Sequence, residues 1–98
     1  MANEEPGARL IDALAEAIEL LRADGEPWSL GWADGLEKQR NRLLQRDGGA
    51  TVVLLTWYGG MGSLNDTVLS GDEGDRLARA LSTIYDESRK LGRELDLL

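Results

Sequence analysis

The stretch of the sequence that most resembles a chemical site is GGMGSLND, residues 59–66, which combines three glycines with a serine and an Asn-Asp pair. Glycine-rich loops can hold phosphate groups, but a phosphate loop also needs a Lys followed by Ser or Thr after its glycines. No Lys or Arg lies between Gly48 and Gly74, and the spacing does not match the dinucleotide pattern G-x-G-x-x-G. We therefore do not expect nucleotide binding at this loop.

Catalysis at the same loop would lack partner groups. The chain contains no His and no Cys, which excludes Ser-His and Cys-His pairs, structural zinc sites and disulfides. Ser63 has no imidazole to activate it, and Asp66 would need a second carboxylate or a lysine. We assign no catalytic, cofactor-binding or metal-binding residue, and the sequence favours a protein that is not an enzyme without deciding the matter.

A turn accounts for the residue types in this stretch. Gly59 and Gly60 can end a preceding helix by adopting a positive φ. Ser63 and Asp66 match the S-x-x-D capping box that begins many helices, and the apolar Met61 and Leu64 can pack beneath the turn. The stretch is a candidate interaction loop or a purely structural one, and its candidate residues are Gly59, Gly60, Met61, Gly62, Ser63, Asn65 and Asp66.

Apolar periodicity predicts an all-α fold, in which a compact bundle of three longer helices surrounds a short apolar helix. The longer helices are expected at residues 7–24, 27–46 and 71–97, where apolar residues recur at helical spacing. Residues 50–58, ATVVLLTWY, fit either a buried helix or a strand, and we prefer the helix. The alternative is an α+β fold with a small hairpin over residues 51–70. Residues 1–98 are expected to form one domain with the first six residues frayed.

Several positions within these helices need an explanation. Gly31 and Gly35 interrupt the second helix, which indicates a close neighbour or a partly irregular first half. Ser88 interrupts the apolar seam of the last helix, whose start fits two competing capping boxes, Ser70 with Glu73 and Asp72 with Asp75. The three tryptophans are expected to fill the core or, alternatively, to line a small-ligand pocket. These candidate pocket residues are Trp28, Trp32 and Trp57.

The net charge of −7 is unevenly distributed along the chain. Eight acids and two bases give residues 1–36 a charge of −6, and five acids give residues 47–75 a charge of −5. Such a surface repels nucleic acid and attracts a basic protein. The basic residues Lys38, Arg40, Arg42 and Arg46 are expected to pair with the acidic first helix. Asp34 and Glu37 fit a weak cation site or an acid–base pair, but we expect a solvated face.

A resemblance adds to this interpretation. GGMGSLNDTVL, with ADGEPWSLGWADGLE before it, resembles a family of small, uncharacterised bacterial proteins of about this length, a domain of unknown function. The matching positions are Gly25, Trp32, Leu36, Glu37 and residues 59–66, and the resemblance spans most of residues 8–85. It implies a mainly helical bacterial domain and supports a helix at residues 50–58. The family has no established activity to transfer.

Two functions follow as hypotheses. The first is a non-enzymatic protein-interaction domain that binds a basic protein, as an immunity or antidote protein does. The second is a small-molecule-binding or carboxylate-based enzymatic domain around the loop at residues 59–66. The sequence predicts no cofactor, no nucleic-acid partner and no membrane association, since its longest uncharged stretch is broken by glycines. We expect a cytoplasmic protein, and the sequence leaves monomer and homodimer both open.

Overall fold

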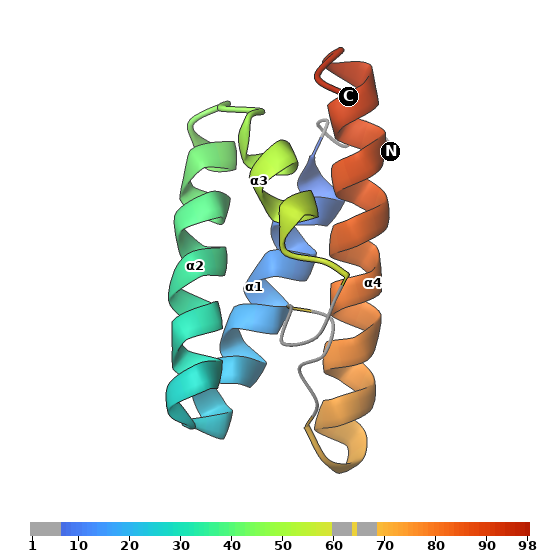
Figure 1. Ribbon diagram of the computed structural model, residues 1–98. Coiled ribbons are helices and arrows are strands. Elements are labelled where there is room, and N and C mark those ends of the chain that lie inside the picture. Colours follow the sequence, from blue (N-terminus) through green and yellow to red (C-terminus); the bar gives the residue numbers. More distant parts are fainter. Residues whose placement is uncertain (1–6, 60–63, 65–68) are drawn as a thin grey trace.

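The regular structure of the chain is helical in the computed structural model, which describes residues 7–59, 64 and 69–98 (Figure 1). These residues form α1 (Ala8–Asp24), α2 (Pro27–Leu44), α3 (Ala50–Thr56) and α4 (Gly71–Glu94). Helix α1 packs against both α2 and α4, and the short α3 packs against α2 and α4. The predicted all-α fold is confirmed. The alternative hairpin is wrong because residues 50–56 are helical.

The core is built on the apolar face of α1. Leu10, Leu14 and Leu21 are completely buried and Ile18 is nearly so, as their helical spacing predicts, whereas Ile11 is only half-buried. Gly25 ends the helix in the left-handed conformation, with φ of 77°, and its N–H donates to the carbonyl of Leu21. The residues before Gly7, with Pro6 among them, lie outside the described part of the chain.

Helices α2 and α4 end earlier than predicted, and for the same reason. Arg46 and Asp96 both have φ of 63°, in the left-handed region that glycine usually occupies after a helix. After α2, the N–H of Arg46 donates to the carbonyl of Leu43 and that of Asp47 to the carbonyl of Arg42. The same pair of hydrogen bonds follows α4. This Schellman geometry ends each helix two to three residues before the predicted boundary.

Helix α3 lies close to α4 because small residues face it. Gly92 of α4 is buried, and a Cβ added there would lie 3.4 Å from Thr51 Oγ1 of α3. Ser88, one turn earlier, is completely buried, and among the described residues its hydroxyl has no hydrogen-bond partner. The serine that interrupts the apolar seam therefore belongs to the core. Within α3 the buried face contains Ala50, Thr51 and Leu54.

The start of α4 differs from both predicted capping boxes. Ser70 is the N-cap residue, but its side chain makes no capping hydrogen bond. Asp72 lies inside the first turn and does not begin the helix. Gly71 has φ of 65°, a left-handed conformation that directs the chain sharply into the helix. The backbone conformation of this turn therefore takes the place of the side-chain cap.

Candidate functional site

Two residues of the GGMGSLND loop, Gly59 and Leu64, lie in the described part of the chain. Gly59 has φ of 87° and follows α3, as predicted for a residue that ends a helix. Leu64 is completely buried, belongs to the hydrophobic core, and donates its N–H to the carbonyl of Trp57 at 2.8 Å. The other candidate residues of this loop lie outside the described part of the chain: Gly60, Met61, Gly62, Ser63, Asn65 and Asp66.

The three tryptophans do not form one group. Trp32 and Trp57 pack against the core with their ring centroids 5.6 Å apart and their planes inclined by 59°. A Cβ on Gly35 would lie 3.2 Å from the Trp57 ring, so the expectation of a close neighbour is confirmed there. A Cβ on Gly31 would meet none of the described residues within 4 Å, so the expectation of a close neighbour is not met there. Trp28, in the first turn of α2, is 46% exposed.

Tyr58 is the most strongly perturbed titratable group in the described residues. Its hydroxyl donates to the carbonyl of Leu81 at 2.7 Å, and its ring lies 5.0 Å from that of Tyr85. Burial raises the pKa of Tyr58 well above its usual value, and the charge of Asp86 raises it further. This phenol stays neutral at physiological pH, so it is a poor general base, and its hydrogen bond joins the segment after α3 to α4.

We predict that Tyr58→Phe makes stability less dependent on pH in the alkaline range. The folded protein keeps the Tyr58 proton above pH 10, where the unfolded chain releases it, so rising pH favours unfolding of the wild type. Urea unfolding followed by tryptophan fluorescence between about pH 8 and about pH 11 measures this slope. The wild type should lose stability more steeply than the variant. Equal slopes would contradict the proposed origin of the pKa shift.

Asp34 and Glu37 bind an arginine of α1 and do not form an open cation site. The guanidinium of Arg22 hydrogen-bonds to Glu37, and its Nη2 atom lies 3.5 Å from Asp34 Oδ1. The hydrogen bond from Arg22 holds the pKa of the Glu37 carboxyl below its usual range. In the described chain, no group of three or more acidic side chains is arranged to hold a metal ion. The pair therefore joins α1 to α2 at the protein surface.

The predicted pairing of the basic residues with the first helix is wrong. Arg40 pairs with Glu37 on its own helix, at 3.8 Å, and Arg42 pairs with Asp47 of the following turn, at 2.9 Å. Helices α1 and α2 are antiparallel, which places the basic end of α2 beside the start of α1 (Figure 1). This arrangement explains why the observed ion pairs differ from the predicted ones. The end of α1, which carries Glu19 and Asp24, instead lies beside the start of α2, whose N-cap residue is Glu26.

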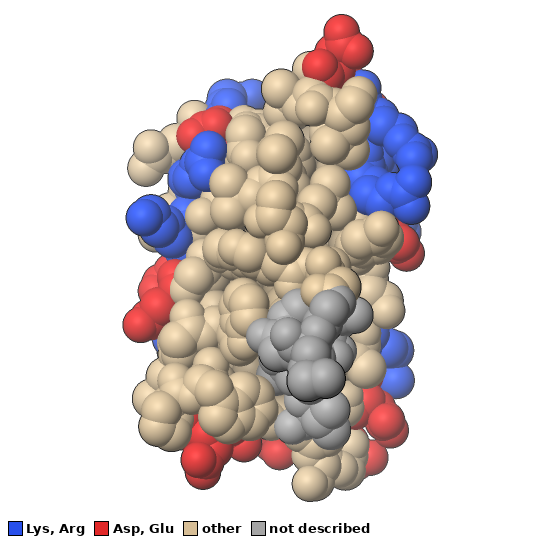
Figure 2. Space-filling view, in the orientation of Figure 1, with Lys and Arg blue, Asp and Glu red and all other residues tan. Residues whose placement is uncertain are grey.

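This arrangement gathers negative charge at one end of the bundle. Helix α1 ends there, and α2 and α4 begin there, so acidic segments far apart in the sequence come together (Figure 1). Acidic side chains lie along the lower edge of the space-filling view (Figure 2). We name this region the acidic end and define it by five exposed carboxylates: Asp24, Glu26, Asp72, Glu73 and Asp75.

The acidic end is not neutralised by neighbouring arginines. Among the described residues, none of its five carboxylates takes part in an ion pair. Arg22 already binds Asp34 and Glu37, and Arg76 binds Glu16 at 3.0 Å. Asp24 accepts a hydrogen bond from the hydroxyl of Ser29, at 2.6 Å, which fixes its position without cancelling its charge. A charge count along the sequence locates the acidic segments but cannot show that they meet.

Fold and site together define a small all-α domain with a strongly asymmetric charge distribution. Among its described residues, no helix is long and apolar enough to cross a bilayer. The chain belongs to a family described as a domain of unknown function (DUF6966), whose model matches residues 22–78. All five residues of the acidic end lie within this range. The comparisons with curated proteins and with solved structures give no match.

Proposed function

We propose that this protein is a non-enzymatic interaction domain that binds a basic protein through its acidic end. One observation carries the proposal: five exposed carboxylates, from α1, the N-cap of α2 and the start of α4, lie at one end of the bundle, and Arg22 and Arg76 are bound to other carboxylates. Charges arranged in this way accelerate the encounter with a partner of opposite sign and select against acidic partners. An immunity-like or antidote-like protein of the bacterial cytoplasm is the setting that we propose.

Helix dipoles explain part of this charge, but not all of it. Asp72 and Glu73 stand in the first turn of α4, where a negative charge is favourable. Asp24 is the last residue of α1, where a negative charge is unfavourable. Crowding of like charges further lowers stability. A surface feature that lowers stability in this way is typical of a binding site.

The test compares two triple variants that change the net charge equally. Asp72→Asn, Glu73→Gln and Asp75→Asn remove three charges from the acidic end. Asp12→Asn, Glu94→Gln and Asp96→Asn remove three exposed charges from outside it. Each protein is used as bait in a lysate of the source cell at low salt, and circular dichroism and thermal melting check the fold.

We expect a basic protein to be retained by the wild type and by the second variant, and to be lost from the first. Retention should weaken as salt is added, because exposed charges are screened within about 10 Å at 0.1 M ionic strength. Equal retention by both variants would contradict the proposal, as would a partner whose binding is insensitive to salt. Loss from both variants would show that net charge, and not the acidic end, determines binding.

A further inference from the structure

A pocket opens at the opposite end of the bundle from the acidic end. It has a volume of about 430 Å³ and lies where α1 begins and α2 and α4 end. Its apolar walls come from three helices and include Leu44 and Leu95, which are 58% and 47% exposed. The other apolar wall residues are Ile11, Leu43 and Leu91. Pockets of this size and character hold small molecules in many proteins.

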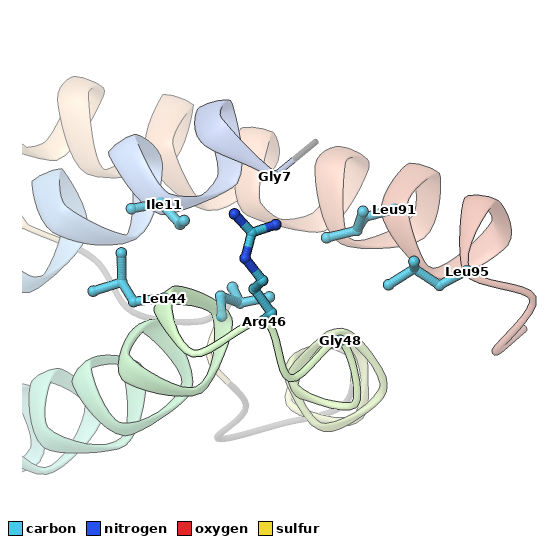
Figure 3. A pocket seen from close by; sticks show the side chains of 8 residues that line it. Gly7, Ile11, Leu44, Arg46, Gly48, Leu91 and Leu95 are labelled. Atoms are coloured by element: carbon cyan, nitrogen blue, oxygen red, sulfur yellow. The ribbon is translucent and has the colours of Figure 1, made fainter. Parts of the chain in front are cut away.

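One charged side chain enters this apolar pocket. Arg46 is exposed and extends toward Gly7, with Ile11 and Leu44 on one side of it and Leu91 and Leu95 on the other (Figure 3). Among the described residues, Arg46 has no ion-pair partner, whereas Arg40 and Arg42 are paired with Glu37 and Asp47. The start of α1 lies beside the guanidinium. The N-terminal end of a helix dipole is positive, so it adds to the positive electrostatic potential that the guanidinium creates in the pocket.

The backbone of Arg46 is also unusual. Its left-handed φ of 63° costs a residue with a Cβ about 1–2 kcal/mol, and glycine would avoid that cost. Gly48 and Gly49 follow within three residues, but neither occupies the left-handed position. Asp96 has the same φ at the end of α4, so this conformation belongs to both helix ends, and the pocket around Arg46 is what distinguishes it.

We infer that this pocket binds a small amphipathic carboxylate, such as a medium-chain fatty acid. The guanidinium supplies paired N–H donors for the carboxylate, in the planar geometry that arginine offers to such groups. The leucines and Ile11 cover the aliphatic chain, which loses its contact with water. This inference concerns the other end of the molecule and is independent of the proposed protein partner.

The experiment is an NMR titration of the full chain with octanoate, and butyrate and 1-octanol serve as controls. Octanoate carries both the charge and the chain, while each control lacks one of them. We expect saturable shifts at the amides of Gly48 and Leu95 with octanoate, and much weaker binding of both controls. Arg46→Gln should weaken octanoate binding by about tenfold or more, because hydrogen bonds to charged groups contribute strongly.

Two further variants separate a binding role from a structural one. Arg46→Gly relieves the left-handed strain, so it should melt no earlier than the wild type and still lose octanoate binding. Lys90→Gln removes an exposed positive charge that does not line the pocket, and it should bind octanoate as the wild type does. The inference is overturned if octanoate gives no saturable shift at the pocket or if Arg46→Gln binds octanoate as well as the wild type. It is also overturned if Lys90→Gln loses as much octanoate affinity as Arg46→Gln.

Discussion

Leu64→Ala should destabilise the protein by about 2–5 kcal/mol, the range for removing a fully buried leucine side chain. Leu64 is 0% exposed and belongs to the hydrophobic core, although it lies in the glycine-rich loop. The truncation would leave a cavity beside α3, and the hydrogen bond from its N–H to Trp57 limits how far the backbone can move to fill it. Chemical unfolding followed by tryptophan fluorescence measures the change.

Leu44→Ala is the matched control. The same three carbons are removed, but Leu44 is 58% exposed, so the change should stay within about 0.5 kcal/mol. If Leu64→Ala were as mild as Leu44→Ala, the loop would not be anchored in the core. A large loss at Leu64 alone assigns a structural task to the centre of GGMGSLND. It leaves Asn65 and Asp66 free to be tested separately for binding.

The helices with regular apolar spacing were predictable because burial follows that spacing directly. In α1 the core covers Leu14, Ile18 and Leu21 at helical spacing, and Gly25 ends the helix because glycine adopts a positive φ without strain. The ends of α2 and α4 were mispredicted because Arg46 and Asp96 take that conformation instead. The sequence did not mark these two positions because neither is a glycine, the residue that usually adopts a positive φ after a helix.

The candidate sites were less predictable because they depend on how the helices pair. The acidic end requires the end of α1 to lie beside the starts of α2 and α4, and a linear charge count contains no such information. The Arg46 pocket requires the start of α1 and the end of α4 to lie beside the end of α2. Arg46 appeared in the sequence only as one member of a basic cluster. Its surroundings distinguish it from Arg40 and Arg42, and they include Ile11, Leu91 and Leu95, which lie more than thirty positions away in the sequence.

Gly74→Ala should destabilise the protein by about 1–3 kcal/mol, the usual cost of inserting a methyl group into a closely packed site. A Cβ at this position would lie 2.0 Å from the carbonyl oxygen of Leu69 and 2.9 Å from its carbonyl carbon. Both atoms belong to the backbone, so no side-chain rotation can relieve the contact. Leu69 packs against the core, which resists the shift that the new methyl group demands. Thermal melting of the variant measures the loss.

Gly31→Ala is the same substitution in another helix, and the opposite sign is expected. A Cβ at Gly31 meets none of the described residues within 4 Å, so the gain in helix propensity should stabilise the protein by about 0.5–1 kcal/mol. If both variants were destabilised, the first half of α2 would depend on a feature other than space around Gly31. If both were stabilised, Leu69 would be able to move, and the entry into α4 would be looser than the geometry indicates. If Gly74→Ala destabilises the protein and Gly31→Ala stabilises it, a glycine within a helix is required at one position and only tolerated at the other. The carbonyl of Leu69, which lies outside α4, would then account for the difference.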